Sequence, residues 1–171
     1  CRLSQLTDAP SRNVLEAVAE LSNWRTPRPA GRARGLAFCL SFGVPVAEVI
    51  EVEQTNTGLR ITNAYAAADV GIALDPRNIE AQVQGAMIYG LSAAITGEIT
   101  FADGVVQQTN FPDNDPLRLY QCPPIAVRIL ENGPKLRGIG EPGTPPAAPA
   151  LANAIFAATG QRIRSLPLAN S

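Results

Sequence analysis

The sequence contains no histidine and only three cysteines. Histidine is the residue that most often acts as a general base, as the partner of a catalytic serine or as a metal ligand, so its absence removes the commonest forms of all three. Cys1, Cys39 and Cys122 show no CxxC or CxxH spacing, which excludes a disulfide framework and a zinc or iron–sulfur site encoded in this chain. Acid–base chemistry therefore depends on carboxylates.

Strong net charge and long apolar runs are also missing. The formal net charge is -1 at pH 7, so the chain has no broad electrostatic field for nucleic acid, and we expect no nucleic-acid partner. No apolar run approaches the roughly 20 residues that span a bilayer, and we expect no membrane span. With 171 residues and 46% hydrophobic content, the chain can form one sizeable core or two small cores that share an interface.

The N-terminal part predicts one amphipathic helix followed by a basic loop. Apolar side chains recur at helical spacing over residues 11–21, and Asp8 or Ser11 can cap the helix. Residues 23–35 contain four arginines, two prolines and two glycines, which favour an extended loop. A solvated basic linker is one interpretation of this loop, and a contact with phosphate or a partner is the other.

The middle of the chain alternates between strand and helix patterns. Residues 36–52 predict two strands, and a third extends over residues 59–70. Apolar residues then step by three and four over residues 79–95, the strongest helix signal in the sequence. Asp75 or Asn78 can cap that helix.

The remaining patterns predict a hairpin, one more strand and a last helix. Residues 98–111 form a β-hairpin around Asp103-Gly104, a pair suited to a two-residue turn. Residues 125–129 alternate as a strand, and a helix starts at Thr144 or Pro149. The fold class that follows is α/β of the α+β type, with mixed sheets and hairpins packed against two or three helices.

One carboxylate, Glu141, lies in the glycine- and proline-rich run GIGEPGTPP at residues 138–146. Glycines in this run let a bulky group approach the main chain, and the start of the following helix favours anions through its unpaired amides. Two interpretations stay open on the residues alone. Glu141 interacts with its own helix dipole or a loop amide, or it is a general base in a closed pocket, where desolvation lets a carboxylate work near neutral pH.

The run GIGEPGTPPAAPALANAIFAATGQRIRSLPL resembles the C-terminal end of the molybdenum-binding large subunit of the xanthine dehydrogenase and aldehyde oxidase family. The resemblance is greatest to the isoquinoline 1-oxidoreductase β-subunit branch. It extends back through PPIAVRIL, EITFADGVVQQTNF, DVGIALDPRNIEAQVQGAMIYGLSAAI and SFGVPVAEVIEVE to GRARGLA, in the same order. It therefore covers nearly the whole chain and implies the fold of a molybdenum cofactor-binding domain.

The resemblance implies oxidative hydroxylation of an N-heterocycle or an aldehyde, with the inserted oxygen coming from water. Glu141 matches the glutamate of the GxGE motif, which implies that it takes a proton from the metal-bound hydroxyl group. Gln82, in AQVQGAMIYGL, matches the glutamine whose amide contacts the molybdopterin near the metal. An amide offers a donor and an acceptor without adding charge beside an anionic ligand, although the residue alone also fits a polar helix position facing water.

The turn ADVGIALDPRN, which precedes the helix of Gln82, is expected to offer backbone amides to the pterin or the pyrophosphate of the cofactor. Asp69, Gly71 and Asn78 are the candidate cofactor-binding residues of this turn, and Gly140 is the candidate of the glutamate loop. A turn former is the alternative role for Asp69, and a helix cap is the alternative for Asn78.

The resemblance also implies what the chain needs to work. The cofactor is molybdopterin, in its cytosine dinucleotide form, and it holds molybdenum through pterin sulfurs instead of protein side chains. The partners are the remainder of the large subunit and a small [2Fe-2S] subunit that carries the iron–sulfur clusters, and the substrate is a small aromatic compound or an aldehyde. We expect the chain to be inactive alone.

The predicted organisation is an N-terminal helix and basic loop over residues 1–35, and a portion of a molybdopterin-binding domain over residues 36–171. The alternative function is a stand-alone interaction or dimerisation domain derived from that fold and lacking catalysis. Cys1-Arg2-Leu3 carries no initiator methionine, and we interpret it as a cut end. A periplasmic and a cytoplasmic location both stay open, because a signal would lie upstream of Cys1.

Overall fold

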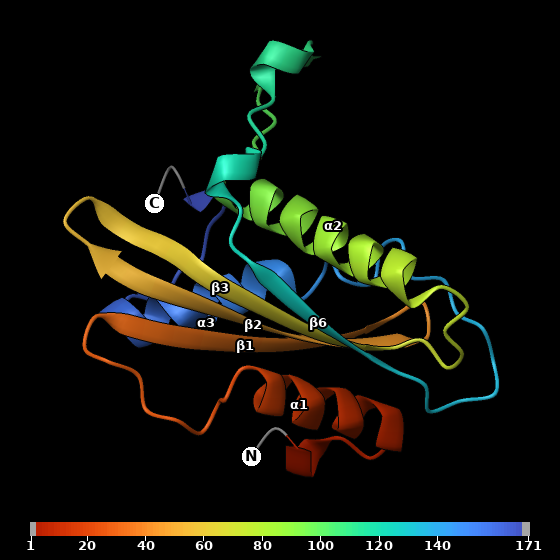
Figure 1. The fold of residues 1–171 in the computed structure, drawn as a ribbon. Helices are drawn as coiled ribbons and strands as arrows, with labels where there is room; N and C mark the ends of the chain where they lie inside the picture. Colours follow the sequence, from red (N-terminus) through yellow and green to blue (C-terminus); the bar gives the residue numbers. More distant parts are fainter. Residues whose placement is uncertain (1–2, 169–171) are drawn as a thin grey trace.

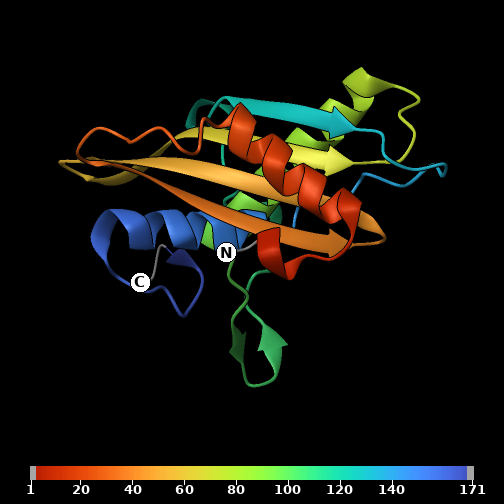
Figure 2. The ribbon, with the colours of Figure 1, turned by 90° about the horizontal axis from the view of Figure 1, so that it is seen from below.

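The protein is described by a computed structural model that covers residues 3–168, so Cys1 lies outside the described residues. The main elements are α1 (Ala9–Leu21), β1 (Arg32–Ser41), β2 (Val44–Thr55), β3 (Gly58–Asp69), α2 (Pro76–Ile95), β6 (Ile125–Leu130) and α3 (Ala147–Thr159). The four strands form one sheet in the order β1-β2-β3-β6. Helix α1 covers one face of this sheet, and α2 and α3 cover the other (Figures 1 and 2).

The sheet is an antiparallel meander of β1, β2 and β3, to which β6 adds in parallel beside β3. A parallel neighbour requires a crossover connection, and here that connection contains α2. The second, two-stranded sheet is a short hairpin of β4 (Phe101–Ala102) and β5 (Val105–Val106) that lies between α2 and β6 in the chain.

Both faces of the main sheet are buried, which gives the chain two apolar clusters. On the α1 face, Val14 and Val18 pack with Leu36 and Val49. The larger cluster, on the opposite face, joins the sheet to Met87 and Leu91 of α2 and to Leu151 of α3; its strand members include Val44, Val46, Ile50, Ala64 and Ala66. Because β2 is buried from Val44 to Val52, its sequence shows a nearly continuous apolar run and only partial alternation.

The structure confirms the predicted fold class and the type of each predicted element. Asp8 and Asp75 are the helix caps, since their carboxylates accept hydrogen bonds from the amides of Ser11 and Asn78. The hairpin strands are shorter than predicted, and α3 begins at Ala147, between the two predicted starts. Within residues 3–168, no helix combines the length and apolar content that crossing a membrane requires.

The prediction of a basic loop over residues 23–35 is partly wrong. Strand β1 already begins at Arg32, and the Arg34 side chain is buried against Glu51 of β2, with 3.0 Å between Nε and Oε2. The Nε atom of Arg28 lies 2.9 Å from the same Oε2 atom of Glu51 and forms a second ion pair with it. These two arginines are therefore drawn into the fold by a buried acid across the sheet, whereas a solvated linker would leave them in water. The division at residue 35 stays a prediction.

Candidate functional site

The glutamate loop, residues 138–146, lies against the middle of α2. A Cβ built on Gly143 would lie 3.1 Å from the Ala86 Cβ, so the backbones of loop and helix approach closely because this position has no side chain. The hydroxyl of Thr144 donates a hydrogen bond of 3.2 Å to the carbonyl of Ala86. The amide of Thr144 also donates to the carbonyl of Glu141 at 2.9 Å, which closes a turn directly after the acid.

The structure brings the glutamate loop next to Gln82. A Cβ on Gly140 would lie 4.0 Å from Oε1 of Gln82, one helical turn before Ala86. Gly138 has open space around its Cα, since a Cβ there would meet nothing within 4 Å. Three of the predicted site residues, Gly140, Glu141 and Gln82, therefore lie side by side although they are far apart in the sequence.

Glu141 and Gln82 are both exposed in this chain. Within residues 3–168 the Glu141 side chain is therefore not enclosed, although Pro142, Gly143 and Pro146 of the same loop are buried. Its role as a general base stays a prediction. The arrangement is instead one open wall, on which a carboxylate and a neutral amide flank glycines that leave room for a ligand. Within the same residues, no group of three or more cysteine and acidic side chains is placed to hold a metal ion.

Asp69 holds two loops together beside this wall. Its buried carboxylate accepts hydrogen bonds from the Gly71 amide at 3.0 Å, and from the amide and side chain of Asn132 at 3.1 and 2.9 Å. The turn after β3 is thereby tied to the segment that leads from β6 toward Glu141. Asp69 is a turn former in the described structure, and a contact with the cofactor stays a prediction.

Gly71 lies in the left-handed region with φ 74°, and a Cβ there would overlap the carbonyl oxygen of Lys135. Glycine is needed at this position for both reasons. Asn78 is exposed in the first turn of α2, where its amide, and not its side chain, takes part in the cap. The amides at the start of α3 were expected to be unpaired. The first of them, the amide of Ala147, instead donates a hydrogen bond of 3.3 Å to the carbonyl of Thr144.

The sequence patterns did not single out two charged residues, Arg137 and Glu48, that lie close to the sheet. The guanidinium of Arg137 lies over Gly43 at the β1–β2 turn, in a small hollow of about 260 Å³ that Asp69 and Gly71 also line. Glu48 is fully buried on β2, and neither of its side-chain oxygens has a hydrogen-bond partner. An acid inside the apolar run VPVAEVI is the sequence signal that identifies it.

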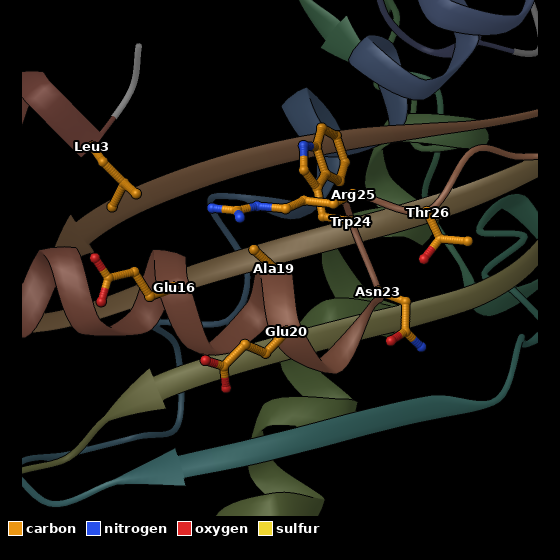
Figure 3. A pocket seen from close by; sticks show the side chains of 8 residues that line it. All are labelled: Leu3, Glu16, Ala19, Glu20, Asn23, Trp24, Arg25 and Thr26. Carbon is orange, nitrogen blue, oxygen red and sulfur yellow. The ribbon is translucent and has the colours of Figure 1, made fainter.

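A larger surface hollow of about 640 Å³ lies on the α1 face (Figure 3). Glu16, Ala19 and Glu20 of α1 line it together with Trp24 and Arg25 of the following loop. None of the predicted site residues borders this hollow, because α1 and the glutamate loop lie on opposite faces of the sheet. It is therefore separate from the candidate site.

Comparisons with known proteins agree on the family and the fold of this chain. Residues 7–123 match the family described as "Molybdopterin cofactor-binding domain". The chain is 36% identical over 173 residues to isoquinoline 1-oxidoreductase subunit beta of Brevundimonas diminuta, an alignment that covers 98% of this chain and 22% of that protein. It is 32% identical over 163 residues to the membrane-bound aldehyde dehydrogenase [pyrroloquinoline-quinone] of Gluconacetobacter polyoxogenes, with 91% and 21% covered.

Among solved structures, quinoline 2-oxidoreductase from Pseudomonas putida 86 is similar with a TM-score of 0.62 and 22% identity, over 73% of this chain and 17% of that one. At this identity the likeness describes the fold. The chain spans about a fifth of the length of the two curated relatives.

Proposed function

The chain belongs to the molybdopterin cofactor-binding domain family, and from that premise we propose that it forms the wall of a molybdenum hydroxylase site that carries the catalytic glutamate. In this proposal the complete subunit replaces a C–H hydrogen of an N-heterocycle or an aldehyde by a hydroxyl group whose oxygen comes from water. An electron pair leaves toward iron–sulfur clusters in a partner chain, and protons are released. The names of the two curated relatives, an isoquinoline oxidoreductase and an aldehyde dehydrogenase, support these substrate classes.

The observation that carries the proposal is the juxtaposition of Glu141 and Gln82 across Gly140. When bound, the cofactor supplies a metal centre that acidifies a water molecule and accepts the electron pair. Glu141 is the base of this chain that takes the proton, since no histidine is available. Gln82 supplies its amide as a donor and an acceptor without changing the charge, and Gly140 keeps the space between the two side chains open.

The cofactor that fits this wall is molybdopterin, for which we propose the cytosine dinucleotide form. In this proposal the pterin, and not a side chain of this chain, holds the metal. The exposed first turn of α2, with Asn78, is the proposed contact for the pyrophosphate, while Asp69 and Gly71 act by holding the adjacent loops. One relative is named for pyrroloquinoline quinone, and cofactor extraction from the purified enzyme separates the two possibilities.

Replacing Glu141 by Gln in the complete enzyme tests the proposal. We expect turnover to fall by about 10²–10⁴-fold, the usual contribution of a general base, while the bound pterin stays near its normal amount because the side-chain shape is kept. Substrate-dependent dye reduction measures turnover, and fluorescence of the oxidised pterin measures cofactor content.

Glu16→Gln is the matched control for that measurement, since Glu16 is an exposed acid on the α1 face. Its turnover should equal that of the unmodified enzyme. Normal turnover of Glu141→Gln would contradict the assignment. A natural polypeptide of 18.0 kDa that functions without the rest of a subunit would instead favour the non-catalytic interaction domain.

A further inference from the structure

Residues 69–73 and 130–136, here together called the clasp, lie side by side at one end of the main sheet (Figure 1). Main-chain atoms of the two segments pair in several places, for example Val70 with Leu130 and Gly71 with Leu136. The carboxylate of Glu131 adds a further link, since it accepts a hydrogen bond of 2.8 Å from the amide of Ala73. The clasp therefore joins the chain that enters α2 to the chain that leads to Glu141.

Asp69 and Asn132 form the centre of the clasp. The Asp69 carboxylate, in a residue that is 3% exposed, accepts hydrogen bonds from the amide and the side chain of Asn132 at 3.1 and 2.9 Å. Within residues 3–168, all the side-chain hydrogen bonds of residues 131–140 are made with residues 69–73. Because Asp69 is buried, loss of the Asn132 side chain leaves an acceptor without a partner away from water, which costs free energy.

The segment between Asn132 and Glu141 is largely exposed. Residues 134–138 are exposed, and Ile139 is the residue of this segment that packs against the larger apolar cluster. Beyond Glu141, the hydrogen bond from the Thr144 hydroxyl holds the loop on α2. Asn132 is therefore an anchor on one side of Glu141, and the contact with α2 is the anchor on the other.

We propose that Asn132 is a positioning residue for the hydroxylation reaction, because its bonds to Asp69 hold the clasp together and thereby set the position of Glu141. The proposal rests on the proposed function. An amide suits this place, since it donates to the carboxylate and brings no charge of its own. An aspartate of the same shape would set two carboxylates about as close as the 2.9 Å of the present bond, where like charges repel each other.

Other charged residues also face the clasp. Asp8, at the start of α1, and Arg137 line the hollow of about 260 Å³ that reaches Asp69. Glu131 and Lys135 belong to the clasp itself and are exposed. All four are the same in the unmodified enzyme and in the variants below, and the chain has no histidine. A pH dependence that appears only in a variant with a new acid at the clasp therefore comes from that acid and its partner.

Asn132→Asp in the complete enzyme tests the proposal by adding a second carboxylate to the clasp. At about pH 5 the two acids share a proton, whose hydrogen bond replaces that of the amide; toward about pH 8 the proton is lost and the two charges repel. We expect turnover per bound pterin, relative to the unmodified enzyme at the same pH, to be nearly normal at the lower pH. At the higher pH it should be at least about tenfold lower, because displacing a catalytic group by ~1 Å costs up to about 10²-fold. The substrate KM should change less than kcat.

Three further variants separate the pairing from other effects. Asp69→Asn combined with Asn132→Asp exchanges the acid and the amide, so the donor and acceptor are restored and turnover at about pH 8 should recover most of the loss. Asn132→Ala removes the side-chain bond without adding charge, so turnover should fall at both pH values with no new pH dependence. Asn56→Asp makes the same change in the exposed β2–β3 turn and should behave like the unmodified enzyme.

Hydrogen–deuterium exchange of the complete enzyme gives a second measurement that does not depend on activity. The clasp has hydrogen-bonded amides at Val70, Gly71, Ala73 and Asn132. In Asn132→Asp at about pH 8 these amides should exchange at least about tenfold faster than in the unmodified enzyme at the same pH, because the repelled segments open locally. The combined exchange variant should return them toward the original rates.

Three results would overturn the proposal: normal turnover of Asn132→Asp per bound pterin at about pH 8, no recovery in the combined variant, or faster amide exchange at the clasp with turnover unaffected. If Asn132→Asp does not fold, Asn132→Ala and the combined variant decide by the same measurements. These outcomes are distinct from a failure of the proposed function. Normal turnover of Glu141→Gln would leave the exchange result at the clasp unchanged, and unchanged turnover of the Asn132 variants would leave the role of Glu141 unchanged.

Discussion

At the scale of single residues, the least expected feature is Glu48. It pairs across the sheet with Ala37 and Ala66, whose small side chains leave space that the glutamate fills on the face covered by α2 and α3. Burial without a hydrogen-bond partner raises the pKa of Glu48 well above its ordinary value of 4.5. The folded chain therefore keeps a proton on this side chain at pH values where the unfolded chain releases it.

This raised pKa predicts that the chain loses stability as the pH rises. The protonated Glu48 contributes most to the free energy of unfolding below pH 4.5, the ordinary pKa of the side chain. As the pH rises from there to the pKa in the folded chain, that contribution falls by at most about 1.4 kcal/mol per pH unit. Glu48→Gln cannot titrate, so its free energy of unfolding should change less between about pH 5 and pH 7. Urea unfolding at several pH values measures the difference. Glu16→Gln should keep the original slope, and equal slopes for Glu48→Gln and the unmodified chain would show that Glu48 is ionised.

At the scale of elements, the position of the glutamate loop depends on the small residues of α2. A Cβ on Gly90 would lie 2.6 Å from the carbonyl oxygen of Thr144 and 2.9 Å from the Ala147 Cβ. Because Gly90 has no side chain, the loop and the start of α3 pack directly against the α2 backbone. Glycine usually weakens a helix interior, so its presence here reflects the close approach of two backbones.

Gly90→Ala should therefore destabilise the chain by about 1–3 kcal/mol, the usual cost of overpacking, because backbone atoms have to move. Gly85→Ala in the same helix meets nothing within 4 Å and should stabilise the chain by up to about 1 kcal/mol through helix propensity. Urea unfolding of the 171-residue chain measures both. Equal effects of the two substitutions would mean that the loop does not pack on Gly90.

At the scale of the whole molecule, a buried ion-pair network holds remote segments on the α1 side of the sheet. Glu51 of β2 meets Arg34 of β1 and Arg28 of the loop after α1. Arg34 also donates a 2.7 Å hydrogen bond to the carbonyl of Asn23, and Arg28 donates one of 3.0 Å to that of Ser22. The network thus fixes the path of the chain between α1 and the sheet.

Arg34→Met should cost about 3–5 kcal/mol, because it leaves the buried Glu51 carboxylate with a single cation. The exposed pair of Arg60 and Glu53 offers a matched control, and Arg60→Met should cost less than about 1 kcal/mol. Denaturant unfolding measures the cost, and limited proteolysis at residues 22–31 reports whether the loop is released. A loss no greater than that of the control would mean that the network contributes little to stability.

Local chemistry in the sequence was enough to predict the elements, whereas the candidate base was assigned by the resemblance to a family. Helix caps, turn pairs and apolar spacing act over a few residues, so α2, the hairpin and the strands of the sheet follow from them. Because the chain has no histidine, acid–base chemistry depends on its carboxylates. The sequence around Glu141 resembles the corresponding run of a known family. Glu48 and Arg34 were not predicted, because burial of a charged residue depends on partners that are distant in sequence.

What the tertiary structure alone decided is which distant segments meet. Three features depend on the parallel addition of β6 beside β3 and on the packing of the glutamate loop against α2: the proximity of Gly140 to Gln82, the hydrogen bonds that Asn132 donates to Asp69, and the exposure of Glu141. Such pairings are set by the shape and volume of packed side chains, which no local pattern encodes. The sequence by itself therefore determined the elements and pointed to Glu141 as the candidate base, and packing determined which segments lie around that residue.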